Sequence, residues 1–170
     1  MPNSIGEQVP GVLLQATRAL RRFLDEVLPT LSSSWWAELV FANLSFHQRR
    51  AVETRRISAL SGLDLAALLR VLDANWHAIA DKLLLTSEAR YYLKEMRTVR
   101  DRWAHAAAAD FSNDDVYRDL DTLQRFLVSI NADEELLSEV TSVEGYSAPG
   151  LFPRRCVEAH GILACHNDAQ

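Results

Sequence analysis

Apolar residues recur at three- and four-residue steps through most of the first 130 residues, and this spacing limits the fold more than any other feature. It places the apolar side chains on one face of an α-helix. The first such stretch begins at Ile5 and ends before Pro29, whose ring stops a helix. The sequence has no alternating apolar run and no Asn-Gly or Asp-Gly hairpin turn. It therefore predicts an all-α bundle of four to five helices.

Residues that can cap helices separate the later apolar stripes. Ser61 or Asp64 can begin a helix whose apolar face extends to Ala80. A long helix is expected from Ser87, and residues 112–115 resemble the capping box of another that ends near Asn131. Three further segments have weaker helical patterns. We expect a short helix over residues 35–46, a basic turn or helix over 47–57 and a short acidic helix over 133–140.

The chain of 170 residues has the length of one domain. Helical periodicity stops after residue 144, so a bundle is expected over 1–144 and a flexible tail over 145–170. The net charge of −5 argues against a protein that coats nucleic acid. However, residues 110–144 carry a net charge of −8 and residues 1–109 carry +3. A local site for an anionic ligand therefore remains compatible with the composition.

Two features of the sequence bear on the compartment. No apolar run approaches the roughly 20 residues that a membrane span needs, and the first residues lack the pattern of a secretory signal. Two cysteines are too few for a disulfide framework. We therefore expect a cytoplasmic protein without membrane contact.

The long helix expected from Ser87 carries the residues best suited to chemistry. Asp101 and His105 are four apart, so the carboxylate can hydrogen-bond the imidazole. Arg100 can supply paired donors to a phosphate, and His105 can transfer protons near neutral pH. Arg100 and His105 are five apart, about 140° around an ideal helix. A site containing both therefore needs a distorted helix or a second copy of the chain. The alternative is an ordinary solvated face of charged side chains.

Residues 100–105, RDRWAH, resemble the signature of the HEPN superfamily, in which an Arg and a polar residue precede a His near the end of a long helix. The segments 63–76, 89–105 and 117–127 resemble one branch of that superfamily. This branch was first recognised in a eukaryotic RNA-surveillance endoribonuclease, and it also occurs in prokaryotic defence proteins. The resemblance covers about residues 55–131.

The resemblance implies a metal-independent endoribonuclease that works without a cofactor as a homodimer. Cleavage would proceed through attack of the ribose 2′-OH at a site shared by two copies. His105 would transfer protons, Arg100 would stabilise charge on the phosphate, and Asp101 would orient His105. The RNA-binding residues expected beside the motif are basic: Lys94, Arg97 and Arg102.

The same resemblance leaves a second function open. Many HEPN domains are inactive and serve as dimerisation or interaction modules of larger complexes. An active domain would belong to a defence or toxin–antitoxin system, with an antitoxin or a helicase or other ATPase as partner. RNA cleavage in EDTA distinguishes the two functions.

Two other groups of residues have ordinary explanations. The tail holds four residues of zinc-binding type, and their spacing matches no standard module, so no metal site is expected. They are Cys156, His160, Cys165 and His166. A cluster of four arginines could contact RNA, but a solvated helix face explains it better: Arg49, Arg50, Arg55 and Arg56.

Overall fold

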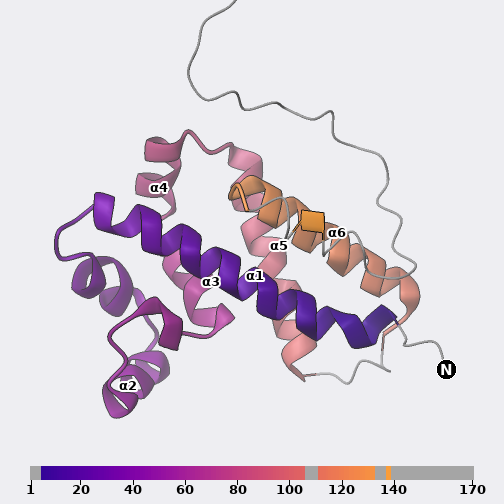
Figure 1. The fold of residues 1–170 in the computed structure, drawn as a ribbon, viewed down its shortest axis with the longest axis horizontal. Coiled ribbons are helices and arrows are strands. Elements are labelled where there is room, and N and C mark those ends of the chain that lie inside the picture. The colour runs from indigo at the N-terminus through magenta and orange to yellow at the C-terminus, as the bar shows by residue number, and fades with distance from the viewer. Residues whose placement is uncertain (1–4, 106–110, 133–136, 139–170) are drawn as a thin grey trace, which may run out of the picture.

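The computed structural model describes residues 5–105, 111–132 and 137–138, and every element within them is helical (Figure 1). The α-helices are α1 (Ile5–Val27), α2 (Phe46–Arg55), α3 (Leu65–Ala74), α4 (Trp76–Leu83), α5 (Ser87–His105) and α6 (Asn113–Ser129). Short 3-10 or π turns are η1 (Leu28–Thr30), η2 (Trp36–Val40), η3 (Phe41–Asn43) and η4 (Leu60–Gly62). The prediction of an all-α fold is confirmed. The 145–170 tail and almost all of the expected 133–140 helix lie outside the described residues.

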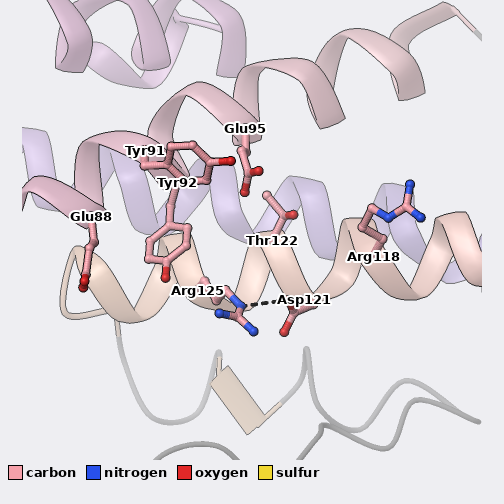
Figure 2. A pocket seen from close by; sticks show the side chains of 8 residues that line it. All are labelled: Glu88, Tyr91, Tyr92, Glu95, Arg118, Asp121, Thr122 and Arg125. Carbon is pink, nitrogen blue, oxygen red and sulfur yellow. Dashed lines mark hydrogen bonds and ion pairs between the residues drawn. The ribbon is translucent and has the colours of Figure 1, made fainter.

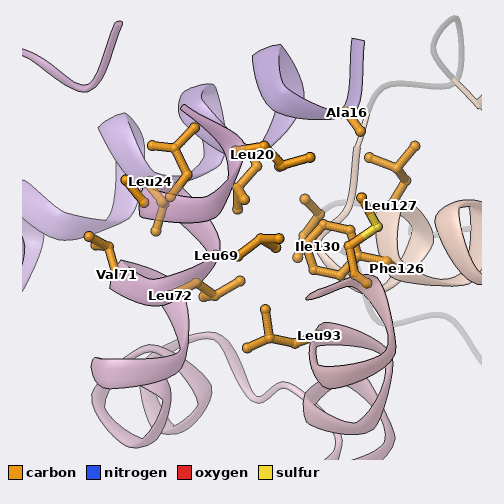
Figure 3. Close-up of a cluster of buried hydrophobic side chains, with 14 of the residues drawn as sticks. Ala16, Leu20, Leu24, Leu69, Val71, Leu72, Leu93, Phe126, Leu127 and Ile130 are labelled. Carbon is orange, nitrogen blue, oxygen red and sulfur yellow. The ribbon is translucent and has the colours of Figure 1, made fainter. Parts of the chain in front are cut away.

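Four helices enclose the core. α1 packs against α3 and α6, and α5 packs against the same two helices, while α2 lies at the edge (Figure 1). The largest fully buried side chains come from all four helices (Figure 3). They include Leu20, Leu24, Leu68, Leu69, Leu72, Leu93, Met96, Leu120 and Phe126. Each contributes about 1.5–3 kcal/mol through removal of apolar surface from water. The apolar stripes of the sequence therefore form the core.

Side-chain caps fix where several helices begin. Asp64 Oδ1 accepts a hydrogen bond of 2.8 Å from the backbone N–H of Ala67 and begins α3. Ser112 caps α6 in the same way, through the backbone N–H of Asp115. Both helix starts were predicted from these residue types. The basic segment also forms a helix, α2, which begins with a capping box between Ser45 and Gln48.

The sequence predicted one helix that begins at Ser61 or Asp64 and extends to Ala80, and the structure divides it at Asn75 into α3 and α4. The buried side-chain Nδ2 of Asn75 donates hydrogen bonds of 2.8 Å to the carbonyls of Leu39 and Val71. The bond to Leu39 joins the break between α3 and α4 to residues 36–43, which lie much earlier in the chain. That segment was expected to be a short helix, and it consists of the turns η2 and η3.

Replacing Asn75 with Ala should lower the free energy of unfolding by about 1–3 kcal/mol, because buried carbonyl groups then lose a hydrogen-bond donor. Chemical denaturation of the two proteins measures this difference. Asn113→Ala is the matched control, since Asn113 is exposed in the first turn of α6 and its change should stay within about 0.5 kcal/mol. Equal losses in both variants would contradict the role given to Asn75.

No helix in the described part of the chain is both long enough and apolar enough to cross a membrane.

Candidate active site

The motif residues lie on the C-terminal half of α5, which is an unbroken helix through His105. Arg100 is half-buried and His105 is exposed. The structure shows no distortion of the helix between them, so their side chains leave it in different directions, about 140° apart. One copy of the chain therefore does not bring Arg100 and His105 together on one face.

Two carboxylates hold the Arg100 side chain. Its Nη1 donates a 2.9 Å hydrogen bond to Oδ1 of Asp101, and its Nη2 lies 3.8 Å from Oδ2 of Asp64. The Asp64 carboxylate also caps α3, so Arg100 leans toward the beginning of that helix. Asp101 was expected to orient His105. Within the described residues it contacts Arg100 instead, and no hydrogen bond joins Asp101 to His105.

Arg97 also faces α3. Its Nη1 lies 3.0 Å from Oδ2 of Asp73, whose other oxygen is 3.6 Å from Nη2 of Arg90. Lys94 is exposed one turn earlier on the helix. Arg97 and Arg100 thus lie near each other along the contact of α5 with α3.

Arg102 points to a different neighbour. Its Nη1 donates to both carboxylate oxygens of Asp119 on α6, at 3.0 and 3.2 Å. The indole Nε1 of Trp103 donates a 2.8 Å hydrogen bond to Oδ2 of the same residue. The Asp119 side chain is only 2% exposed. The structure therefore separates Arg102 from Arg97 and Arg100 and uses it to join α5 to α6.

The surroundings of Asp119 act on its ionisation in opposite directions. Burial raises the pKa of the carboxyl above its usual 3.8, although the hydrogen bond from Trp103 and the charge of Arg102 lower it. The Trp103 ring packs on Phe111 with centroids 4.4 Å apart. These contacts hold the last turn of α5 in place at Trp103, two residues before the helix ends at His105.

A pocket of about 120 Å³ lies beside Arg97 and Arg100. It is lined by α2, α3 and α5: Gln48, Ala66, Leu69, Arg70, Arg97, Arg100 and Asp101. Gln48 and Arg70 were not among the predicted site residues. A signal was present for Arg70, which is the only charged residue before Asp73 in the otherwise apolar sequence of α3.

A larger pocket, of about 390 Å³, lies between the N-terminal half of α5 and α6 (Figure 2). Its charged residues are three carboxylates and two arginines: Glu88, Glu95, Asp121, Arg118 and Arg125. Arg125 Nε donates a 2.8 Å hydrogen bond to Asp121, and a hydrogen bond to Glu95 raises the pKa of Tyr91. This mixed lining suits an anionic polymer less well than the smaller pocket does.

The chain matches the protein-family model described as Swt1-like HEPN over residues 12–131. The matched range contains almost all of the described bundle, including the whole of α5. No curated protein and no solved structure matches significantly.

Proposed function

The chain belongs to the Swt1-like HEPN family, and on this premise we propose that it is a metal-independent endoribonuclease. One observation carries the proposal. The Arg100 guanidinium lines a surface pocket beside Arg97, and the exposed His105 ends the same helix. One helix, α5, therefore carries both a phosphate-binding group and a proton-transfer group, and they point in different directions.

The proposed reaction is an attack of the ribose 2′-OH on the adjacent phosphorus. His105 accepts the proton of the 2′-OH as the new O–P bond forms. The bond from phosphorus to the 5′-oxygen breaks, and a second His105 supplies the proton to that oxygen. Arg100 stabilises the charge that develops on the phosphate oxygens. The products are a 2′,3′-cyclic phosphate and a free 5′-OH.

The straight helix supports a site made by two copies of the chain. Because Arg100 and His105 of one α5 point in different directions, a second α5 across a two-fold axis would bring the missing group to the phosphate. It would also provide the second His105 that the proton transfers need. We therefore propose a homodimer as the active form.

The contacts of Arg100 define what the substrate has to displace. A phosphate that binds the guanidinium through paired hydrogen bonds competes with Asp101 at 2.9 Å and Asp64 at 3.8 Å. Arg97 and Lys94 add positive charge for the RNA backbone. Arg102 is already paired with Asp119, so it would contribute less to RNA binding than was expected.

Cleavage of a modified substrate tests this reaction. In EDTA, the protein should cut an RNA oligonucleotide and leave 2′,3′-cyclic phosphate ends, detectable by mass spectrometry. The same oligonucleotide with 2′-O-methyl groups should stay intact, because the attacking hydroxyl is blocked. Cutting of the methylated strand, or loss of all cutting in EDTA, would refute the mechanism.

The two carboxylates on Arg100 favour a second function, that of an inactive HEPN module that holds a larger complex together. A dimer that cuts no RNA under these conditions would support it. Either function is compatible with a defence or toxin–antitoxin system in the cytoplasm, with an antitoxin or an ATPase as partner.

A further inference from the structure

The small pocket between α2, α3 and α5 has three guanidinium groups around one hollow. Arg70 comes from α3, and Arg97 and Arg100 come from α5. Asp101 is the one carboxylate among the lining residues. If the neighbouring Asp64, Asp73 and Arg90 are included, arginines still outnumber carboxylates by four to three. The pocket is therefore electropositive despite the acidic composition of the chain.

Arg70 differs from the other two guanidinium groups of the pocket in its partner, which is a backbone carbonyl and not a carboxylate. Its Nε donates a 2.9 Å hydrogen bond to the carbonyl of Asn43, which fixes the direction of the side chain. Within the described residues, no carboxylate lies within ion-pair distance of it. Its two terminal nitrogens therefore keep their donors for a ligand.

Gln48 adds a neutral donor from α2. Its Oε1 accepts a 2.9 Å hydrogen bond from the backbone N–H of Ser45 in the capping box of α2. This bond orients the amide and leaves its Nε2 as a donor. Ala66 and Leu69 form the apolar part of the lining.

The size of the pocket limits what it can hold. Its volume of about 120 Å³ is well below the roughly 300 Å³ at which pockets for whole small molecules begin. Planar guanidinium groups with paired donors match the oxygens of a phosphate. The pocket thus has room for a single phosphate group, and the rest of a nucleotide would lie outside it.

We propose that this pocket binds a backbone phosphate of the RNA substrate next to the one that is cleaved, with Arg70 and Gln48 as binding residues beside Arg97. The proposal rests on the proposed function, because Arg100, which also lines the pocket, would hold the reacting phosphate. It adds α2 and α3 to the RNA-binding surface and defines the path of the strand along the α3–α5 contact.

Binding of a strand that cannot be cut tests the pocket separately from catalysis. Fluorescence anisotropy with a labelled 2′-O-methyl oligonucleotide gives the association constant at several salt concentrations. Arg70→Ala should reduce the slope of log K against log salt by about 0.7, and should weaken binding about fivefold near 0.1 M salt. Arg18→Ala is the control, since Arg18 is an exposed arginine of α1 outside the pocket, and it should match the wild type.

Arg70→Lys separates charge from structure. Lysine keeps the positive charge and cannot reproduce the Nε hydrogen bond to Asn43. It should therefore retain the wild-type salt slope. If Arg70→Lys loses as much slope as Arg70→Ala, or if Arg70→Ala binds like Arg18→Ala, the proposal is overturned. Failure of the wild type to bind the strand also overturns it.

Inorganic phosphate is the second probe, because a free anion could use the same donors. NMR signals of the arginine side chains report its binding at constant ionic strength. If the pocket is assigned to a phosphate of RNA, inorganic phosphate should bind more weakly than the strand does. It should then compete with the strand only at high phosphate concentration. Stronger binding of inorganic phosphate would overturn that assignment. Binding to the strand without any cutting of ordinary RNA would support the pocket and refute the nuclease.

Discussion

His105→Ala should slow RNA cleavage at least roughly 10²–10⁴-fold, because it removes the general base of one copy and the general acid of the other, and one such group alone contributes this factor. His105 is exposed at the last residue of α5, so its truncation takes nothing from the core. The free energy of unfolding should accordingly change by no more than about 0.5 kcal/mol, as for an ordinary surface substitution. Single-turnover cleavage of a labelled RNA at fixed dimer concentration measures the rate.

The matched control is His77→Ala, because His77 is exposed on α4 outside the motif. It should cut at the wild-type rate. Equal rates for the wild type and His105→Ala would remove the histidine from the mechanism. A slow His105→Ala protein that remains folded and dimeric would instead assign the loss to proton transfer.

Asp119→Ala should lower the free energy of unfolding by about 2–3 kcal/mol. The change leaves the Trp103 indole N–H and the Arg102 guanidinium without their acceptor. Removal of one partner from a buried ion pair costs about 3–5 kcal/mol. The value should be smaller here because Arg102 is 32% exposed and can turn to water. For a chain of this length, the melting temperature should fall by roughly 4–12 °C.

Asp121→Ala is the control for this change, on the same helix and also paired with an arginine. The carboxylate of Asp121 is 32% exposed and binds Arg125, so its loss should cost at most about 1 kcal/mol. If both variants were equally stable, the Asp119 cluster would not join α5 to α6.

The raised pKa of Asp119 gives this pair a pH dependence. Burial makes the folded protein bind the carboxyl proton more tightly than the unfolded chain does. This pKa difference therefore favours the folded protein fully below the unfolded pKa of about 3.8, and this part of the stability is lost as pH rises through the folded pKa. The stability of the wild type relative to Asp119→Asn should decrease over the same range. An increase would contradict burial as the dominant cause.

Contacts between residues that are close together in the sequence could be predicted from it. The capping roles of Asp64 and Ser112 depend on backbone groups only three residues away. The burial of Met96 and Val99 in α5 also follows from helical spacing alone. The division at Asn75 could not be predicted in this way, since the apolar stripe continues through Trp76 and Ile79. It depends on the Leu39 carbonyl, which is 36 residues distant in the chain.

The candidate site shows the same limit. The four-residue spacing of Asp101 and His105 permits a hydrogen bond, but the adjacent guanidinium of Arg100 takes the carboxylate. The burial of Asp119 depends on two side chains of α5. Arg70 joins the site only because η3 and α5 pack beside α3. Side-chain partners from other helices, which spacing does not reveal, decide each case.

The double contact of Asp64 has a consequence for engineering. One of its oxygens begins α3, and the other lies beside Arg100. An attempt to raise the affinity of Arg100 for phosphate by removing this negative charge would also fray a core helix, so gain and loss would be linked in one substitution. Asp101 is exposed and caps nothing. It is therefore the position at which the charge around Arg100 can be tuned without changing the architecture.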